Sequence, residues 1–187
     1  MKDLDLDKYL DENIDNIAND VIMLKEEEEN DILFYVGSML QANGYTVSDS
    51  EDDSVIVAEE FSLMKSLNVF NVFITEESQT KSSDSASAIR AAAISTGGKL
   101  KDRLQKTICS DEHIYNVLGS YTDDNVKNVI KSLLPKIATL VGVSLTSGFW
   151  IGVIAAVLAL IIKLSYNAYC QTYWDKNPSV KNMLVNK

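Results

Sequence analysis

Two side chains that could act together in nucleophilic catalysis stand four residues apart near the middle of the chain. Cys109 precedes His113 by about one helical turn, and Asp111 and Glu112 lie between them. A thiol beside an imidazole can be activated, because the base takes the thiol proton. Such a site also needs a third, orienting residue and donors for an oxyanion, and no sequence motif supplies either. We therefore expect no catalytic residues and a protein that is not an enzyme.

A short glycine-containing segment, Thr96 to Lys99, partly matches a phosphate-binding loop. That loop needs a first glycine where this chain has Ala93, and a serine or threonine where it has Leu100. The mismatch argues against a nucleoside triphosphatase. A glycine break between two helices, over about 86–94 and 99–108, fits every residue.

Acidic residues are abundant but do not have the spacing of metal sites. Residues 3–7, DLDLD, begin like a calcium loop, yet Lys8 occupies the position that needs glycine and Ile14 the position that needs glutamate. The acidic runs 26–29 and 51–53 are typical of solvated surface. Because the chain has one histidine and two cysteines, we expect no metal and no cofactor.

One basic cluster could contact an anionic ligand such as a nucleotide, a nucleic acid or a lipid headgroup. Its members are Lys99, Lys101, Arg103 and Lys106. No aromatic residue is interleaved to stack unpaired bases. Because the chain has a net charge of -10, we also expect no duplex nucleic acid partner. The alternatives are a solvated helix face and an internal partner for the acidic N-terminal part of the chain.

Charge divides the chain into two unequal parts. Residues 1–60 hold 18 acidic and 3 basic residues, whereas residues 61–187 hold 9 acidic and 14 basic ones, which together give the net charge of -10. The first part should repel nucleic acid and anionic lipid, and the second need not.

The pattern of apolar residues predicts a small α+β domain at the N-terminus. Helical spacing predicts amphipathic helices over 3–24 and 28–42, and β-branched runs predict strands over 45–47, 54–58 and 69–75. Residues 78–87 are polar and are interpreted as a loop or linker. Short helices follow over 86–94, 99–108 and 111–118. The expected sheet is short and antiparallel.

The strongest signal in the sequence is an apolar run near the C-terminus. Residues 137–162 are 26 consecutive uncharged residues between Lys136 and Lys163. A helix needs about 20 such residues to cross a bilayer, so we predict one transmembrane helix over 137–162. Before it, apolar residues of 126–137 repeat at helical spacing. After it, four aromatic residues suit a membrane interface: Tyr166, Tyr169, Tyr173 and Trp174.

A buried helical hairpin is the alternative interpretation of the same run. Helices over about 125–145 and 149–170 would turn at 146–148 and pack inside a globular domain. The length of the run, its bracketing lysines and its trailing aromatic residues favour the membrane interpretation.

Small residues recur every fourth position inside the apolar run. They are Ser144, Gly148, Gly152 and Ala156, and the two glycines form a GxxxG motif. Small side chains on one stripe let membrane helices approach closely, so this stripe predicts association into a homo-oligomer.

The predicted organisation has four parts: a soluble α+β domain over 1–110, a helical neck over 111–136, the transmembrane helix over 137–162 and a polar and aromatic tail over 163–187. The acidic N-terminus lacks the pattern of a signal peptide, so we expect the N-terminal domain in the cytoplasm and a single pass near the C-terminus. Cys109 and Cys170 are then expected to be free thiols.

A small domain gathered at a membrane without catalytic residues suggests an oligomeric membrane effector, a channel or membrane-perturbing protein that its cytosolic domain controls. A regulatory protein or a nucleotide could supply the control. In layout the chain resembles transmembrane effectors of bacterial antiphage defence systems. Two alternatives remain: a passive membrane-anchored adaptor that binds a basic partner, and a soluble binding or inhibitor subunit with a buried helical hairpin.

Overall fold

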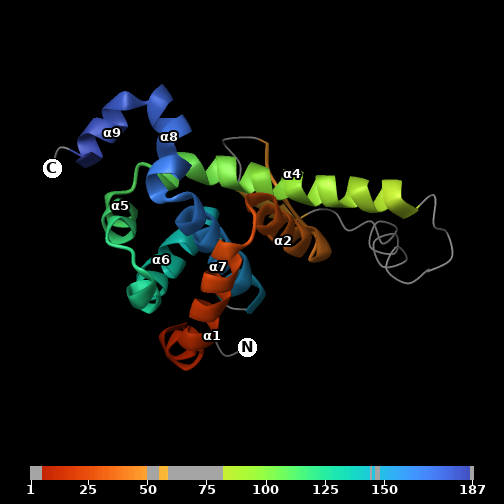
Figure 1. Ribbon diagram of the computed structural model, residues 1–187, viewed down its shortest axis with the longest axis horizontal. Helices are drawn as coiled ribbons and strands as arrows, with labels where there is room; N and C mark the ends of the chain where they lie inside the picture. Colours follow the sequence, from red (N-terminus) through yellow and green to blue (C-terminus); the bar gives the residue numbers. More distant parts are fainter. Residues whose placement is uncertain (1–5, 50–54, 59–81, 144, 146–147, 186–187) are drawn as a thin grey trace.

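The computed structural model describes residues 6–49, 55–58, 82–143, 145 and 148–185, and these residues are mostly α-helical (Figure 1). Helices account for 84% of them. In chain order the elements are α1 (Leu6–Glu26), α2 (Glu29–Ala42), β1 (Tyr45–Val47), β2 (Ile56–Ala58), α4 (Ser82–Ile108), α5 (Glu112–Gly119), the 3-10 helix η1 (Asp123–Asn125), α6 (Val126–Val141), α7 (Gly148–Leu164), α8 (Tyr166–Lys176) and α9 (Pro178–Val185).

The predicted α+β class is wrong. Within the described residues the only β-structure is the antiparallel hairpin of β1 and β2, in which Tyr45 lies opposite Ala58 and Val47 opposite Ile56. Each strand has three residues, and a two-stranded hairpin is too small to form a core of its own. The third predicted strand, 69–75, lies outside the described residues.

Helices α2 and α4 form the closest helix pair of the fold, and they run in opposite directions. Leu33 of α2 lies against Gly97 of α4, and Gly37 of α2 lies against Ala93 of α4. A Cβ atom on Gly97 would come within 2.2 Å of the Leu33 carbonyl oxygen, and one on Gly37 within 1.8 Å of the Ala93 carbonyl oxygen. Only glycine at these two positions permits the approach.

The two helices predicted over 86–94 and 99–108 are one continuous helix, α4, which passes through Gly97 and Gly98 without a break. The predicted break is wrong because the packing of α4 against α2 offsets the low helix propensity of glycine. The predicted loop 78–87 is also wrong in its second half, since α4 already begins at Ser82. In Figure 1 α4 is the long helix that runs across α2.

The predicted transmembrane helix over 137–162 is wrong as well, since two helices divide that segment. Helix α6 ends at Val141, where Gly142 adopts a left-handed conformation with φ 80°, and α7 begins at Gly148. Among the described residues no single helix has the length and apolar content to cross a membrane. One pair, α7 and α8, meets that test only when taken together, with 83° between the two helices. The division of the run into two helices agrees with the hairpin alternative, but the single helix which that alternative predicts over 149–170 is wrong, because Ser165 separates α7 from α8.

Helix α7 lies at the centre of the fold, where α1, α2, α6 and α8 contact it (Figure 1). Its ten buried side chains are Ile151 and those of 153–161. One hydrophobic core joins nine of these residues to buried residues of all four parts predicted from the sequence, while Leu160 packs with Ile32 and Leu33 in a second cluster. A helix that is apolar on every side must be enclosed, and here the enclosure is other helices of the same chain.

Candidate functional site

The small-residue stripe of α7 lies against other helices of the same chain. A Cβ atom on Gly152 would lie 3.2 Å from the Met39 methyl carbon of α2, and one on Gly148 would lie 3.7 Å from the Tyr9 hydroxyl of α1. Ala156 is fully buried. Ser144 is outside the described residues. In this fold half-buried Gly152 therefore faces α2, while Gly148 is exposed near Tyr9 of α1.

Exposed ion pairs join α1 to α6. Asp11 pairs with Lys131, and Asp15 pairs with Lys127. Both partners of each pair keep a large exposed fraction, so each pair contributes only about 0–1 kcal/mol to the free energy of unfolding. Carboxylates of α1 thus pair with lysines of α6 that remain about half exposed, beside the contact that α1 makes with α7.

A second set of polar contacts fixes the end of α1. The Lys25 ammonium lies 2.5 Å from the Asp123 carboxylate of η1, and the Tyr121 hydroxyl donates a 2.6 Å hydrogen bond to the same carboxylate. These two donors hold the pKa of Asp123 below its ordinary value. Burial, and then the bond to Asp123, raises the pKa of Tyr121. Tyr121 therefore stays a neutral donor at physiological pH.

The predicted anion-binding cluster is neutralised in part by carboxylates of the N-terminal half. Lys99 lies 2.8 Å from Asp49, and Lys101 lies 2.6 Å from Glu29. Lys99 also lines a shallow groove with Asp49 and six other residues: Ser48, Val55, Asp102, Arg103, Lys106 and Thr107. Acidic groups stand beside basic ones in this groove. The internal-partner alternative is therefore confirmed for Lys99 and Lys101.

The Cys109 and His113 pair considered as a catalytic dyad is not present. The Cys109 sulfur is bonded to Cys170, so it holds no nucleophilic thiol. The His113 Nε2 atom lies 2.8 Å from the Ser132 hydroxyl oxygen on α6. In the part of the chain that is described, no three histidine, cysteine, aspartate or glutamate side chains gather as a metal site would need.

Asp111 begins α5 and links it to α6. Its carboxylate accepts a 3.0 Å hydrogen bond from the Ile114 backbone N–H as an N-cap, and it lies 2.8 Å from the Lys136 ammonium. Burial alone would raise the pKa of this carboxyl, but hydrogen bonds from Lys136 and from the backbone of Ile114 and His113 hold it below its ordinary value. The ionised form is thus the one the fold stabilises.

We expect the free energy of unfolding of the Asp111→Asn variant to depend less on pH, in the acid range, than that of the wild type. A folded-state pKa below the unfolded one gives a contribution that is complete above the unfolded pKa and is lost as pH falls through the folded pKa. The free energy of unfolding of the wild type should therefore fall more steeply than that of the variant as the pH is lowered below about 4. Asparagine keeps the N-cap, whereas Asp111→Ala should cost about 1 kcal/mol at neutral pH. Urea titrations at each pH measure the free energies of unfolding of the wild type and the variants. If this free energy falls equally with pH in the wild type and in Asp111→Asn, the lowered pKa of Asp111 would be wrong.

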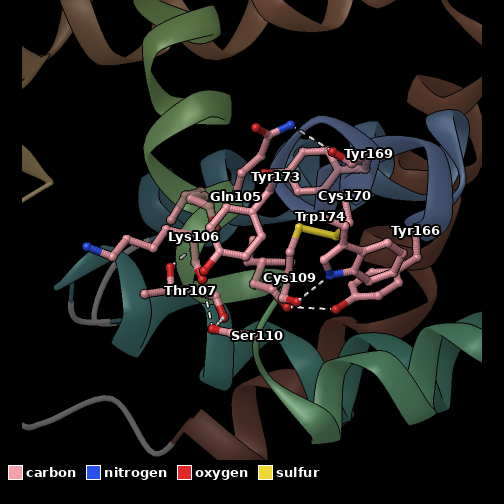
Figure 2. The surroundings of a disulfide bond; sticks show 12 residues. Gln105, Lys106, Thr107, Cys109, Ser110, Tyr166, Tyr169, Cys170, Tyr173 and Trp174 are labelled. Carbon is pink, nitrogen blue, oxygen red and sulfur yellow. Dashed lines mark hydrogen bonds between the residues drawn. A yellow bond between two sulfur atoms is a disulfide. The ribbon is translucent and has the colours of Figure 1, made fainter. Parts of the chain in front are cut away.

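The disulfide between Cys109 and Cys170 corrects the expectation of two free thiols, and it attaches the end of α4 to α8 (Figure 2). Both sulfurs are fully buried. The Trp174 indole N–H donates to the Cys109 carbonyl at 2.9 Å, and the Tyr166 hydroxyl donates to the Ile108 carbonyl at 2.8 Å. The spacing of two cysteines in a sequence does not predict such a pairing.

Three of the four aromatic residues expected at a membrane interface are buried in the core instead. Tyr166, Tyr169 and Trp174 are each at most 7% exposed, while Tyr173 is partly exposed. The Tyr169 hydroxyl donates to the Lys101 carbonyl at 2.9 Å. The Gln105 amide donates to the Tyr169 carbonyl at 2.7 Å (Figure 2). Buried aromatic residues with satisfied polar ends suit the joint between two helices as well as they suit an interface.

The chain matches no protein-family model, no curated protein and no solved structure. The resemblance to transmembrane antiphage effectors rested on a membrane helix over 137–162, which the structure does not contain. The properties of the fold that bear on function are thus the enclosed apolar helix α7, the ion-paired helices around it and the disulfide.

Proposed function

We propose that the protein is a membrane-perturbing effector that keeps its apolar helix α7 inside a shell of its own helices until the shell opens. The observation that carries this proposal is the composition of α7 together with its position. Fifteen consecutive uncharged residues, 148–162, form a helix that α1, α2, α6 and α8 enclose. Exposed ion pairs, which are individually weak, add to the contacts that hold α1 onto this assembly.

Release of α7 would favour lipid over water. Each buried valine, leucine or isoleucine side chain that becomes exposed to water costs about 1.5–3 kcal/mol, whereas the bilayer interior accepts it. Helix α6 presents eight buried residues on one side and carries lysines on another, which is the character of a helix that lies in a membrane interface. Together α6 and α7 form the segment we propose to enter the membrane.

The lengths of these helices favour perturbation of the bilayer. Helix α6 has 16 residues and α7 has 17, so at about 1.5 Å per residue each is shorter than the hydrocarbon core of about 30 Å. A short apolar helix thins the bilayer around it or associates with other copies. The stripe consists of Gly148, which is exposed at rest, Gly152, which is half-buried, and Ala156, which is buried. Release of α7 would make the whole stripe available for association into a homo-oligomer.

Tryptophan fluorescence tests the proposal, because Trp150 stands at the start of α7 while Trp174 is buried beside the disulfide. Full-length protein is mixed with vesicles that contain lipids brominated on the acyl chains and an entrapped self-quenched dye. We expect bromolipid quenching of Trp150 together with release of the dye. In the matched variant Trp150→Phe, release should continue and the quenching should be lost. Vesicles that stay intact, with no quenching of Trp150, would contradict the proposal.

The complete burial of α7 also favours a second candidate, the binding or inhibitor subunit with a buried hairpin. In that case the apolar helix is only the core of the fold. The protein should then purify as a monodisperse species without detergent, leave vesicles intact and show no lipid quenching under any condition that keeps it folded.

A further inference from the structure

We infer that the lysines of α6 form a binding surface for anionic phospholipid headgroups, and that α1 occupies this surface in the resting fold. This inference rests on the proposed function, since it says how the effector would recognise its membrane. It concerns Lys127 and Lys131, which pair with Asp15 and Asp11 of α1.

The two ion pairs form a ladder between antiparallel helices. Asp11 and Asp15 stand one turn apart on α1, and Lys127 and Lys131 stand one turn apart on α6 in the opposite order. The remaining lysine of α6, Lys136, pairs with Asp111 at 2.8 Å. Each lysine of this helix therefore has a carboxylate beside it, where an anionic headgroup would otherwise lie.

The other side of α6 explains why the partner is a lipid surface. The helix buries an apolar face that consists of Val126, Val129, Ile130, Leu133, Leu134, Ile137, Ala138 and Val141. A helix with lysines beside a broad apolar face binds anionic bilayers through both, because the charges meet headgroups and the face enters the acyl boundary. Nucleic acid would pair with the lysines of α6 but would offer no contact for its apolar face.

The acidic residues of α1 also give this helix a negative charge that repels an anionic membrane. The chain has a net charge of -10, and α1 itself carries six carboxylates against two lysines. A helix of this charge beside the half-exposed lysines Lys127 and Lys131 would repel an anionic membrane. Movement of α1 away from α6 would expose the lysines at the same time as it uncovers part of α7, because α1 contacts both helices.

The experiment uses full-length protein and flotation with two kinds of vesicle, pure phosphatidylcholine and phosphatidylcholine with phosphatidylglycerol. The variant Asp11→Asn with Asp15→Asn removes the carboxylates that cover Lys127 and Lys131. We expect its binding to the anionic vesicles to rise about tenfold, since each lysine freed near such a surface contributes attraction. Binding to pure phosphatidylcholine should not change.

A matched control makes the same change of net charge elsewhere. Asp20 and Glu27 are exposed and form no ion pair with any described residue, so Asp20→Asn with Glu27→Gln should give no comparable rise. Adding Lys127→Gln and Lys131→Gln to the first variant should abolish its gain. Equal gains in the control, or a gain that survives the lysine changes, would overturn the inference. Circular dichroism shows that each variant is folded.

Two further arms separate the outcomes. Inorganic phosphate at matched ionic strength should not compete, and strong competition would show that the lysines take free phosphate, which overturns the lipid assignment. Dye release measured on the same samples tests the proposed function separately. Binding without release would leave the lipid surface standing and refute the effector. Dye release by the wild type, with no gain in vesicle binding by the Asp11→Asn and Asp15→Asn variant, would support the effector and refute the lipid surface.

Discussion

Replacing Gly97 with alanine should destabilise the protein by about 3 kcal/mol or more, although alanine is the better helix former. The new methyl group would lie 2.2 Å from the Leu33 carbonyl oxygen and 2.9 Å from its carbonyl carbon, which are backbone atoms of α2. A backbone cannot turn aside as a flexible side chain can, so α2 and α4 must separate. Urea unfolding followed by circular dichroism measures the loss.

The neighbouring residue supplies the control. Gly98 lies in the same helix, and a Cβ atom built there meets nothing within 4 Å. Gly98→Ala should therefore raise the free energy of unfolding by about 0.5–1 kcal/mol through helix propensity alone. Gly37→Ala should resemble Gly97→Ala, because its Cβ would lie 1.8 Å from the Ala93 carbonyl oxygen. If Gly97→Ala proved as stabilising as Gly98→Ala, the close approach of α2 and α4 would be wrong.

Loss of the disulfide should have the largest effect among changes to single interactions. Cys109 and Cys170 are separated by 61 positions, and the segment they close holds α5, α6 and α7. Closing a loop of that length removes unfolded-chain entropy equivalent to about 4 kcal/mol at 25 °C. In the variant Cys109→Ser with Cys170→Ser we expect the melting temperature to fall by about 10 °C. Calorimetry without reductant measures the difference.

Reduction of the wild type shows whether loss of the disulfide causes the lower melting temperature. A phosphine reductant should lower the melting temperature of the wild type toward that of the double serine variant and should leave the variant unchanged. Because both sulfurs are fully buried, reduction in the native state should be slow and should accelerate in mild urea. A wild type that melts at the same temperature with and without reductant, after thiol titration proves reduction, would contradict the expected stabilisation.

The local elements were the predictable part of this fold. The helix predicted over 3–24 is confirmed from residue 6 onward as α1, and the helix predicted over 28–42 is confirmed as α2. Their apolar residues recur at the helical period, and acidic residues fill many of the other positions of α1. The hairpin strands are confirmed at 45–47 and 56–58. The helix predicted over 111–118 is confirmed as α5, which Asp111 caps. These features depend on neighbours within about one turn.

The wrong predictions have a common cause: the same sequence pattern is compatible with two different surroundings in a folded protein. Residues 148–162 are apolar enough for a lipid, and they are equally suited to the interior of a helical shell. The glycines at 97 and 98 indicate a break when read alone, yet the contact of Gly97 with Leu33 keeps α4 continuous. Three of the aromatic residues after α7 pack into the core instead of a membrane interface.

The amphipathic acidic helices, the charge imbalance and the apolar segment are predictable from composition and periodicity, which are properties of the chain alone. The pairing of Asp11 and Asp15 with Lys131 and Lys127, and the bond between Cys109 and Cys170, depend instead on how the helices pack. These contacts join residues from 61 to 120 positions apart. No local rule reaches that distance, because such pairs form only when the core around α7 brings the helices together.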